Sequence, residues 1–247
     1  MSIKALILAA GYGTRMRPLT EHTPKPLLQA GGKALIEYTI DSLVKAGVRD
    51  LVINHAWLGE QIEAALGDGS RYGARIRYSA EGEPLETAGG IRKALPLLAS
   101  DDAGGDTNDF EFIVTNGDVY CEYDYSQLLE HRLATGQLAH VLLTENPEHN
   151  TAGDFLLYDD GRVRTKPLIQ GTAMSAGQAR VMTFSGIGRY RSSMFSQLPA
   201  GAYPLAPVLR KAMDQGGVTG QALEATWLDI GTVDRLQALD RMLQSRP

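Results

Sequence analysis

Residues 3–13 read I-K-A-L-I-L-A-A-G-Y-G, a mostly apolar segment over positions 3–9 followed by Gly11 and Gly13. An apolar run without polar alternation is typical of a strand that is covered on both faces, as in the centre of a parallel sheet. Glycines placed directly after such a strand let the backbone turn sharply and approach a ligand closely. This stretch therefore predicts a central strand with a binding loop at its carboxyl end.

Strand and helix patterns alternate after this segment. The expected strands are 51–54, 76–78, 110–114 and 140–144, and the expected helices are 35–44, 58–66 and 126–133. Helices that alternate with short apolar strands indicate right-handed crossovers in an α/β fold. The order predicts a three-layer sandwich around a mostly parallel, mixed central sheet of the Rossmann-like type.

The second half of the chain predicts a small antiparallel addition. Asp159-Asp160-Gly161 separates the strand-like positions 155–158 and 162–164, which is a hairpin signal. Further elements are expected as a strand over 181–190, a helix over 204–213 and a final helix from 233 that Thr232 caps. With no internal repeat or long linker, we expect one domain over 1–247.

The composition excludes several classes of protein. Apolar residues make up 43% of the chain, which favours a buried core, and 24 basic against 29 acidic residues give a net charge of −5. This balance argues against binding nucleic acid or anionic membranes through broad charge neutralisation. One cysteine cannot form an intramolecular disulfide, and no window reaches the ~18 to 20 apolar residues of a membrane span. We expect a cytoplasmic protein with neither nucleic acid nor membrane as a partner.

Basic residues gather around the glycine loop. Arg15 and Arg17 follow Gly13, and two prolines fix the chain on either side of Lys25. Successive backbone N–H groups in such a loop form a concavity that binds anions, and the added cations favour a polyphosphate. A tight turn with solvated basic residues is the alternative, and the rigid Pro-Lys-Pro segment favours binding over it.

Two familiar nucleotide motifs are absent from this region. Met16 stands where a dinucleotide fingerprint needs its third glycine. A P-loop through Gly32-Lys33 would need a glycine at Leu27 and a hydroxyl residue at Ala34. Any phosphate site here must therefore follow another pattern.

Two aspartates follow predicted sheet positions. Asn116-Gly117-Asp118 comes directly after the strand at 110–114, and Asp229 precedes the last helix. An aspartate of this kind, taken alone, is more often a turn former or a helix cap. Together with a phosphate loop, two carboxylates favour Mg²⁺, which binds one or two carboxylates, several waters and substrate phosphates.

A loop over 81–90, E-G-E-P-L-E-T-A-G-G, precedes a helix that we expect to begin near Ile91. Gly89 and Gly90 would let a flat ring lie against the backbone. A plain helix N-terminus with Thr87 as its cap explains the same residues. The spacing alone leaves both interpretations open.

Four motifs in order resemble the sugar-1-phosphate nucleotidyltransferase family. They are L-A-A-G-Y-G-T-R-M-R-P-L-T from Leu8, P-K-P around Lys25, N-G-D ending at Asp118 and W-L-D-I-G-T around Asp229. The resemblance implies a nucleotide-binding α/β sandwich that transfers a nucleotidyl group to a sugar 1-phosphate and releases pyrophosphate, with Mg²⁺ as cofactor.

The resemblance also implies roles for the matching residues. Those expected at the nucleotide are Gly11, Gly13, Thr14, Arg15, Lys25, Ala88, Gly89 and Asn116, with Ala88 and Gly89 at the base. The expected catalytic residues are Arg15, Lys25, Asp118 and Asp229, of which Asp118 and Asp229 would bind Mg²⁺.

Within the family, the loop over 81–90 and the segment H-N-T-A-G-D-F over 149–155 favour one substrate pair. They resemble enzymes that transfer a uridylyl group from UTP to N-acetylmuramate α-1-phosphate in cell-wall recycling. Asp154 would then lie at the sugar, with Glu81 and Lys166 as further candidates, although Asp154 is equally explained as a hairpin-edge carboxylate. The alternatives are mannose-1-phosphate guanylyl transfer, glucose-1-phosphate nucleotidyl transfer and a non-catalytic nucleotide-sugar sensor.

Overall fold

The computed structural model describes residues 3–99, 109–166 and 179–246. Strand β1 (Lys4–Leu8) lies inside a nine-stranded sheet, between β4 (Asp50–His55) and β6 (Glu111–Asn116). Both neighbours run parallel to it, and Leu8 pairs with Asn54 on one side and Asn116 on the other. The expected central strand is therefore confirmed, and its carboxyl end meets the carboxyl ends of both neighbours at one edge.

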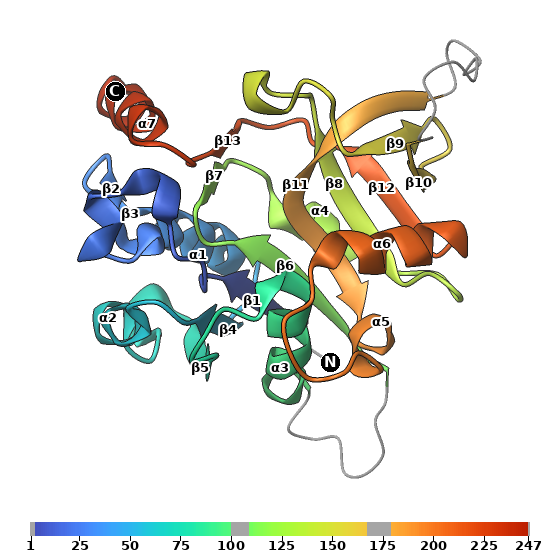
Figure 1. Ribbon diagram of the computed structural model, residues 1–247, viewed down its shortest axis with the longest axis horizontal. Helices are drawn as coiled ribbons and strands as arrows, with labels where there is room; N and C mark the ends of the chain where they lie inside the picture. The colour runs from blue at the N-terminus through green and yellow to red at the C-terminus, as the bar shows by residue number, and fades with distance from the viewer. Residues whose placement is uncertain (1–2, 100–108, 167–178, 247) are drawn as a thin grey trace.

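The rest of the sheet is mixed (Figure 1). Strand β5 (Arg75–Ala80) extends the parallel half beside β4. The long strand β11 (Ala179–Arg191) runs antiparallel to β6, to β8 (Ala139–Thr144) and to β9 (Phe155–Tyr158). The predicted hairpin joins β9 to β10 (Val163–Thr165), and β12 (Val218–Ala222) lies parallel to β8.

Helices cover both faces of the sheet. Because side chains alternate along a strand, β1 contributes residues to the core on each face. Ala5 and Ile7 face a core shared with α1 (Leu35–Lys45), α2 (Gly59–Leu66) and α4 (Tyr125–Glu130). Leu6 faces the opposite core, which includes residues of α3 (Glu86–Leu98), α5 (Ser193–Ser196) and α6 (Leu205–Asp214). The three-layer sandwich is therefore confirmed. None of the helices in the described parts of the chain has the length and apolar character needed to cross a membrane.

A third apolar cluster holds the loop after β1 in place. Met16, in the short helix η1 (Thr14–Met16), packs with Tyr120 of β7 (Val119–Cys121), with Ile230 and with Leu239 of α7 (Val233–Gln244). Strands β7 and β13 (Trp227–Asp229) pair with each other in a separate two-stranded sheet. The Thr232 hydroxyl accepts a hydrogen bond from the Arg235 N–H, which confirms the predicted cap of α7.

The remaining elements are short and lie near the ends of the larger ones. They are η2 (Leu19–Glu21), η3 (Lys25–Leu27), β2 (Gln29–Ala30), β3 (Lys33–Ala34), η4 (Ser70–Tyr72) and η5 (Glu148–Asn150).

Two helix boundaries differ from the sequence expectation. Helix α3 begins at Glu86, well before Ile91, because the Tyr203 carbonyl accepts the N–H groups of Ala88 and Gly89. Thr87 therefore lies inside the helix and does not cap it. Helix α4 ends at Glu130, short of position 133, where the Arg189 guanidinium donates to the carbonyls of Leu128 and Leu129.

Candidate active site

A cleft runs along the carboxyl ends of β1 and β6. It consists of three adjoining hollows that all include Leu8 in their walls. The loop hollow is bounded by the loop after β1, the α3 hollow by the start of α3, and the wide hollow, of about 600 Å³, by β11 and α6. Arg15 lines the loop and wide hollows, whereas Asp118 lines the loop and α3 hollows. The shared walls indicate one continuous binding cleft.

The two loop glycines serve different needs. Gly13 has φ +63°, and a Cβ there would lie 2.9 Å from Cγ2 of Thr20, so internal packing demands a glycine. Gly11 lies outside the left-handed region, and no described atom lies within 4 Å of a Cβ placed on it. It borders both the loop hollow and the α3 hollow. The fold itself tolerates a side chain at Gly11, so the open space beside it is available to a ligand.

Thr14 and Arg15 lie on η1, where both line the loop hollow. The Arg15 guanidinium forms no hydrogen bond or ion pair with the residues that the structure describes. Arg17, predicted as a further cation, lies outside the walls of the three hollows. Met16, which lies between the two arginines, is fully buried. One loop arginine therefore faces the cleft, rather than two.

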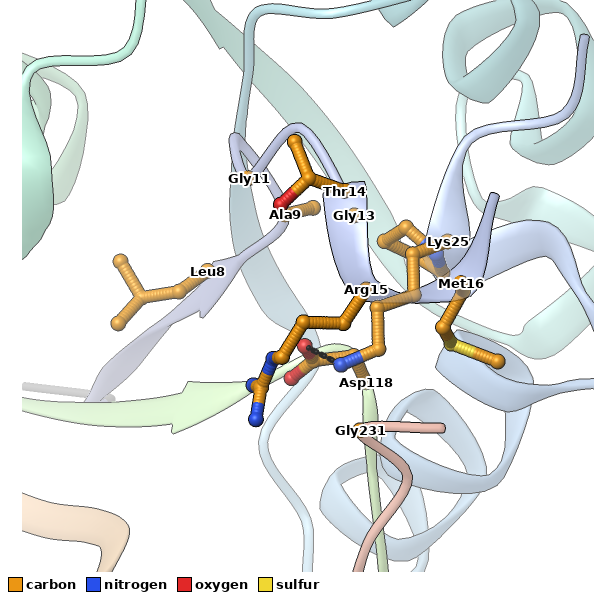
Figure 2. A pocket seen from close by; sticks show the side chains of 11 residues that line it. Leu8, Ala9, Gly11, Gly13, Thr14, Arg15, Met16, Lys25, Asp118 and Gly231 are labelled. Atoms are coloured by element: carbon orange, nitrogen blue, oxygen red, sulfur yellow. Dashed lines mark hydrogen bonds and ion pairs between the residues drawn. The ribbon is translucent and has the colours of Figure 1, made fainter. Parts of the chain in front are cut away.

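Lys25 forms an ion pair with Asp118, with 2.6 Å between Nζ and Oδ2. The lysine side chain is only 9% exposed and is held between the buried Pro24 and Pro26. Figure 2 shows the Lys25 and Arg15 side chains extending from the loop toward Asp118. The structure thus brings the loop cations and the first predicted carboxylate together.

Asp229 reaches the same region through strand pairing. Asp229 of β13 pairs with Val119 of β7, the residue next to Asp118. A Cβ on Gly231 would lie 3.0 Å from Oδ2 of Asp229 and 3.3 Å from Nη1 of Arg15, so both groups border this glycine. The pairing of β7 with β13 therefore gathers side chains that are more than a hundred residues apart in sequence.

Two further residues hold Asp229, and the sequence analysis did not find them. Arg235 Nη1 lies 2.9 Å from Oδ2 of Asp229 and 3.2 Å from its carbonyl oxygen. His149 Nε2 lies 3.5 Å from the same Oδ2. The sequence offered one signal for Arg235. It stands in the first turn of the helix that Thr232 caps, and this turn lies beside the residues before the cap, which include Asp229.

The carboxylate pair fits a hard divalent cation with few protein ligands. Among the described residues, no group of three or more histidine, cysteine, aspartate or glutamate side chains is arranged to hold a metal. Asp118 and Asp229 offer two carboxylates, and Mg²⁺ typically completes its octahedron with waters and substrate phosphates. The residues present therefore suit Mg²⁺ bound together with a phosphate ligand, and do not suit an all-protein cage.

The α3 hollow differs from the expectation for the base. Ala88 is fully buried, and a Cβ on Gly89 would lie 2.3 Å from the Gly201 carbonyl oxygen, so both pack inside the protein. Glu86 and Thr87 line the hollow in their place, together with the predicted Asn116. The expected contact of Ala88 and Gly89 with a base stays a prediction about their backbone, because α3 starts earlier than expected and packs both residues inward.

Glu81 lies at the α3 hollow and not beside Asp154. Its Oε1 accepts a hydrogen bond from Asn54 Nδ2 at 2.7 Å, and its Oε2 accepts one from the Leu85 N–H at 2.8 Å. Asn54 Oδ1 in turn accepts the Ala9 N–H at 2.9 Å. The prediction of Glu81 at the sugar stays a prediction; in the structure its carboxylate ties the end of β4 to the loop before α3.

Asp154 lines the wide hollow, as a sugar-binding residue requires. Its Oδ1 accepts a hydrogen bond from Asn150 Nδ2 at 3.1 Å, and its Oδ2 accepts the Phe184 N–H at 2.9 Å. Lys166, the other predicted sugar residue, lies outside the cleft walls and donates to the carbonyls of Ala152 and Gly153. Lys166 therefore fixes the turn that carries Asp154, and its role at the sugar stays a prediction.

The sequence resembles those of known sugar-1-phosphate nucleotidyltransferases. It is 49% identical over 239 residues to N-acetylmuramate alpha-1-phosphate uridylyltransferase of Neisseria meningitidis serogroup B, covering 95% of this chain and 96% of that protein. It is 30% identical over 253 residues to mannose-1-phosphate guanylyltransferase catalytic subunit beta of Danio rerio, covering 98% of this chain and 65% of that protein. Mannose-1-phosphate guanyltransferase of Hypocrea jecorina is 38% identical, over 61% of this chain and 40% of its own.

Solved structures share the fold. A Bacillus anthracis protein described as a glucose-1-phosphate thymidylyltransferase, crystallised with sucrose, superposes with a TM-score of 0.80 at 21% identity, covering 100% of this chain and 97% of that chain. HddC of Yersinia pseudotuberculosis with GMP-PN gives a TM-score of 0.75 at 21% identity, over 97% and 99% of the two chains. The profile of the nucleotidyl transferase family matches residues 4–246. The chain therefore belongs to the nucleotidyl transferase family.

Proposed function

We propose that this protein transfers a uridylyl group from UTP to N-acetylmuramate α-1-phosphate, giving UDP-N-acetylmuramate and pyrophosphate. The observation that carries the proposal is the 49% identity to the N. meningitidis uridylyltransferase across 95% of this chain. The cleft supports it, because a phosphate-sized opening beside Gly11 meets two cations and two carboxylates. We further propose that the reaction takes place in the cytoplasm and serves peptidoglycan recycling.

The loop after β1 would hold the triphosphate. Gly11 leaves room for phosphate oxygens against the backbone, and Arg15, which has no partner among the described residues, directs its guanidinium into the cleft. Lys25 supplies a second cation next to Asp118. Two anions must approach each other in this reaction, and these fixed positive charges offset their repulsion without reorganising.

Asp118 and Asp229 would bind Mg²⁺. When bound, the ion would polarise the phosphate oxygens and supply positive charge at the reacting phosphorus. Arg235 and His149 hold Asp229 in its present orientation. The protein's own contribution is thus a pair of carboxylates fixed at one edge of the sheet.

The transfer needs no protein nucleophile. An oxygen of the sugar phosphate attacks the α-phosphorus in line, the new O–P bond forms, and the bond to the pyrophosphate oxygen breaks as pyrophosphate leaves with the electron pair. A phosphate monoester is already anionic at neutral pH, so no proton must be removed first. The nearby Cys121 has no such role, because burial raises the pKa of its thiol to about 11.

The two ends of the cleft divide the substrates. Glu86, Thr87 and Asn116, which line both the α3 hollow and the wide hollow, would lie at the nucleoside, and the backbone of the loop over 81–90 would read the base edge. Asp154 would accept hydrogen bonds from sugar hydroxyls in the wide hollow. Arg15, which lines both the loop and the wide hollow, would lie between the two reacting phosphates.

Pyrophosphate release over a grid of four nucleoside triphosphates and several sugar 1-phosphates tests the proposal. We expect turnover with UTP and N-acetylmuramate α-1-phosphate to exceed every other pair. A preference for GTP with mannose 1-phosphate would contradict it and would favour the activity named for the H. jecorina and D. rerio relatives. No turnover with any pair would instead indicate a nucleotide-sugar sensor.

A further inference from the structure

Arg210 is a second cation at the wide hollow, on a different element from the phosphate loop. Helix α6 lines this hollow with Leu205, Ala206, Leu209 and Arg210. Positions one turn apart on a helix share a face, so Ala206 and Arg210 lie on the same side. Leu205 and Leu209 are buried against the core, which fixes the helix and leaves the exposed Arg210 at the edge of the cleft.

The other basic residues of this hollow are Arg15 and His149, and each also belongs to the region around the loop after β1 and Asp229. Arg15 also lines the loop hollow, beside the predicted phosphate site. His149 contacts Oδ2 of Asp229. Arg210 forms no hydrogen bond or ion pair within the part of the chain that the structure describes. A guanidinium presented to a cleft in this way is suited to a carboxylate or phosphate of a ligand, which it can bind with two parallel hydrogen bonds.

The acidic residues that line the hollow are Glu86, Asp154 and Asp229, and none of them forms a hydrogen bond or ion pair with Arg210 in the described structure. Both oxygens of Asp154 accept hydrogen bonds from Asn150 and from the Phe184 backbone. Asp229 is paired with Arg235. Arg210 is therefore available to an anionic group of a ligand in the hollow.

The substrate in the proposed function carries a suitable second anion. N-acetylmuramate differs from N-acetylglucosamine by a lactyl ether on C3, which ends in a carboxylate. Its phosphate is on C1 and would lie toward Arg15 and Asp118, so the C3 substituent points to another part of the hollow. Resting on that proposed function, we propose that Arg210 binds the lactyl carboxylate and selects this sugar over the same sugar without the lactyl group.

Kinetics of Arg210→Gln test the proposal, with Lys211→Gln as the matched control. Lys211 is exposed on the same helix and lies outside the cleft walls. We expect Arg210→Gln to raise the KM for N-acetylmuramate 1-phosphate about 10- to 100-fold, as the loss of a hydrogen-bonded charged contact does. The kcat should stay near that of the wild type, because the contact is remote from the reacting phosphorus and is the same in the ground and transition states.

N-acetylglucosamine 1-phosphate distinguishes recognition of the lactyl group from a general effect on the site. Its inhibition constant against the N-acetylmuramate substrate should be the same in the wild type, in Arg210→Gln and in Lys211→Gln. Arg210→Lys should fall between wild type and Arg210→Gln, because a lysine keeps the charge and loses the two-bond geometry.

The outcomes separate this proposal from the function on which it rests. An unchanged KM in Arg210→Gln, or an equal weakening of both sugar phosphates, would overturn the role of Arg210 while leaving uridylyl transfer intact. Failure of the wild type to use N-acetylmuramate 1-phosphate with UTP would instead refute the proposed function.

Discussion

At the scale of single residues, Gly11 and Gly13 are both glycines for different physical reasons. Gly13 has a left-handed backbone and a close neighbour in Thr20, so the folded loop excludes a side chain. Gly11 has neither constraint, and a side chain there would project into the open cleft. The sequence predicted both as loop glycines, but only coordinates separate the glycine that the fold requires from the one that a ligand would require.

Alanine at each glycine therefore gives opposite results. Gly13→Ala should lower the free energy of unfolding by about 1 to 2 kcal/mol or more, from the left-handed backbone and the contact with Thr20. Gly11→Ala should leave that free energy unchanged and raise the KM for UTP. Urea denaturation and pyrophosphate release measure the two effects. Loss of stability in Gly11→Ala would argue that the fold, and not the nucleotide, needs this glycine.

Removing a charge at the phosphate site should reduce the rate while the protein stays folded. Asp118→Asn, Asp229→Asn and Lys25→Ala should each lower kcat about 10²- to 10³-fold, as removal of a preorganised electrostatic contact does. Far-ultraviolet circular dichroism should match the wild type. Near-normal pyrophosphate release in any of the three would contradict the role proposed for that residue.

At the scale of elements, the short β7–β13 sheet organises the chemistry. It sets Asp229 opposite Val119, the residue that follows Asp118 in the sequence. Helix α7 comes shortly after β13, and its Arg235 donates a hydrogen bond to the Asp229 carboxylate. Neither strand is long enough to show a periodic pattern, so the sequence analysis found the two aspartates as motifs without the strands that join them. Strand pairing across such a separation is a tertiary contact, which local periodicity does not encode.

Arg235 is a positioning residue for Asp229 in this description. Arg235→Gln should lower kcat about 10- to 100-fold, the usual cost of losing a group that orients a metal ligand. The reduction should persist at saturating Mg²⁺ and substrates, and Arg235→Lys should recover part of the rate. Arg241→Gln, on an exposed position of the same helix, is the matched control. Full activity in Arg235→Gln would show that Asp229 needs no such support.

A stacked pair of histidines lies far from the cleft, where β8 meets β12. The ring centroids of His131 and His140 are 3.5 Å apart, and His140 contacts Thr219 and Gln221. Burial lowers the pKa of His140 to about 4, with a further lowering by His131. Burial also lowers the pKa of His131. Both rings are therefore neutral in the folded protein at neutral pH.

This pair predicts a loss of stability in mild acid. Above about pH 6.5 the folded and unfolded states are both neutral here. As the pH falls from 6.5 to 4, the unfolded state takes up a proton that folded His140 resists, so its contribution of about 2 to 3 kcal/mol is lost. Urea denaturation at pH 7 and pH 5 should show less loss in His140→Gln than in the wild type or in the exposed His22→Gln. An equal loss in all three would refute the assignment.

At the scale of the whole molecule, a chain with a net charge of −5 gathers the cations proposed to bind phosphate in one loop. The sequence predicted the layers well, because alternating apolar runs and helical stripes record which faces are buried. The packing of Ala88, Gly89, Glu81 and Lys166 could not be predicted from the sequence, since their surroundings depend on where α3 and the turn before β9 pack. Arg210 and Arg235 were not found because each reaches the cleft from a helix whose placement is set by tertiary contacts.

Chelation should separate activity from stability. EDTA should abolish pyrophosphate release, and Mg²⁺ should restore it. The Tm should stay the same, because Lys25 and Arg235 already neutralise the two carboxylates without a metal. Thermal denaturation with and without EDTA measures this. A lower Tm in EDTA would indicate that the metal is part of the fold, and activity that persists in EDTA would refute the proposed Mg²⁺ site.

The β7–β13 pairing also bears on how the protein is made. A ribosome that adds about 5 to 20 residues per second incorporates Asp118 several seconds before it incorporates Asp229. During that interval the loop cations and the first carboxylate are present without the second carboxylate. A nascent chain that stops short of β13 therefore lacks half of the carboxylate pair, so the proposed reaction would begin only after synthesis has passed residue 229.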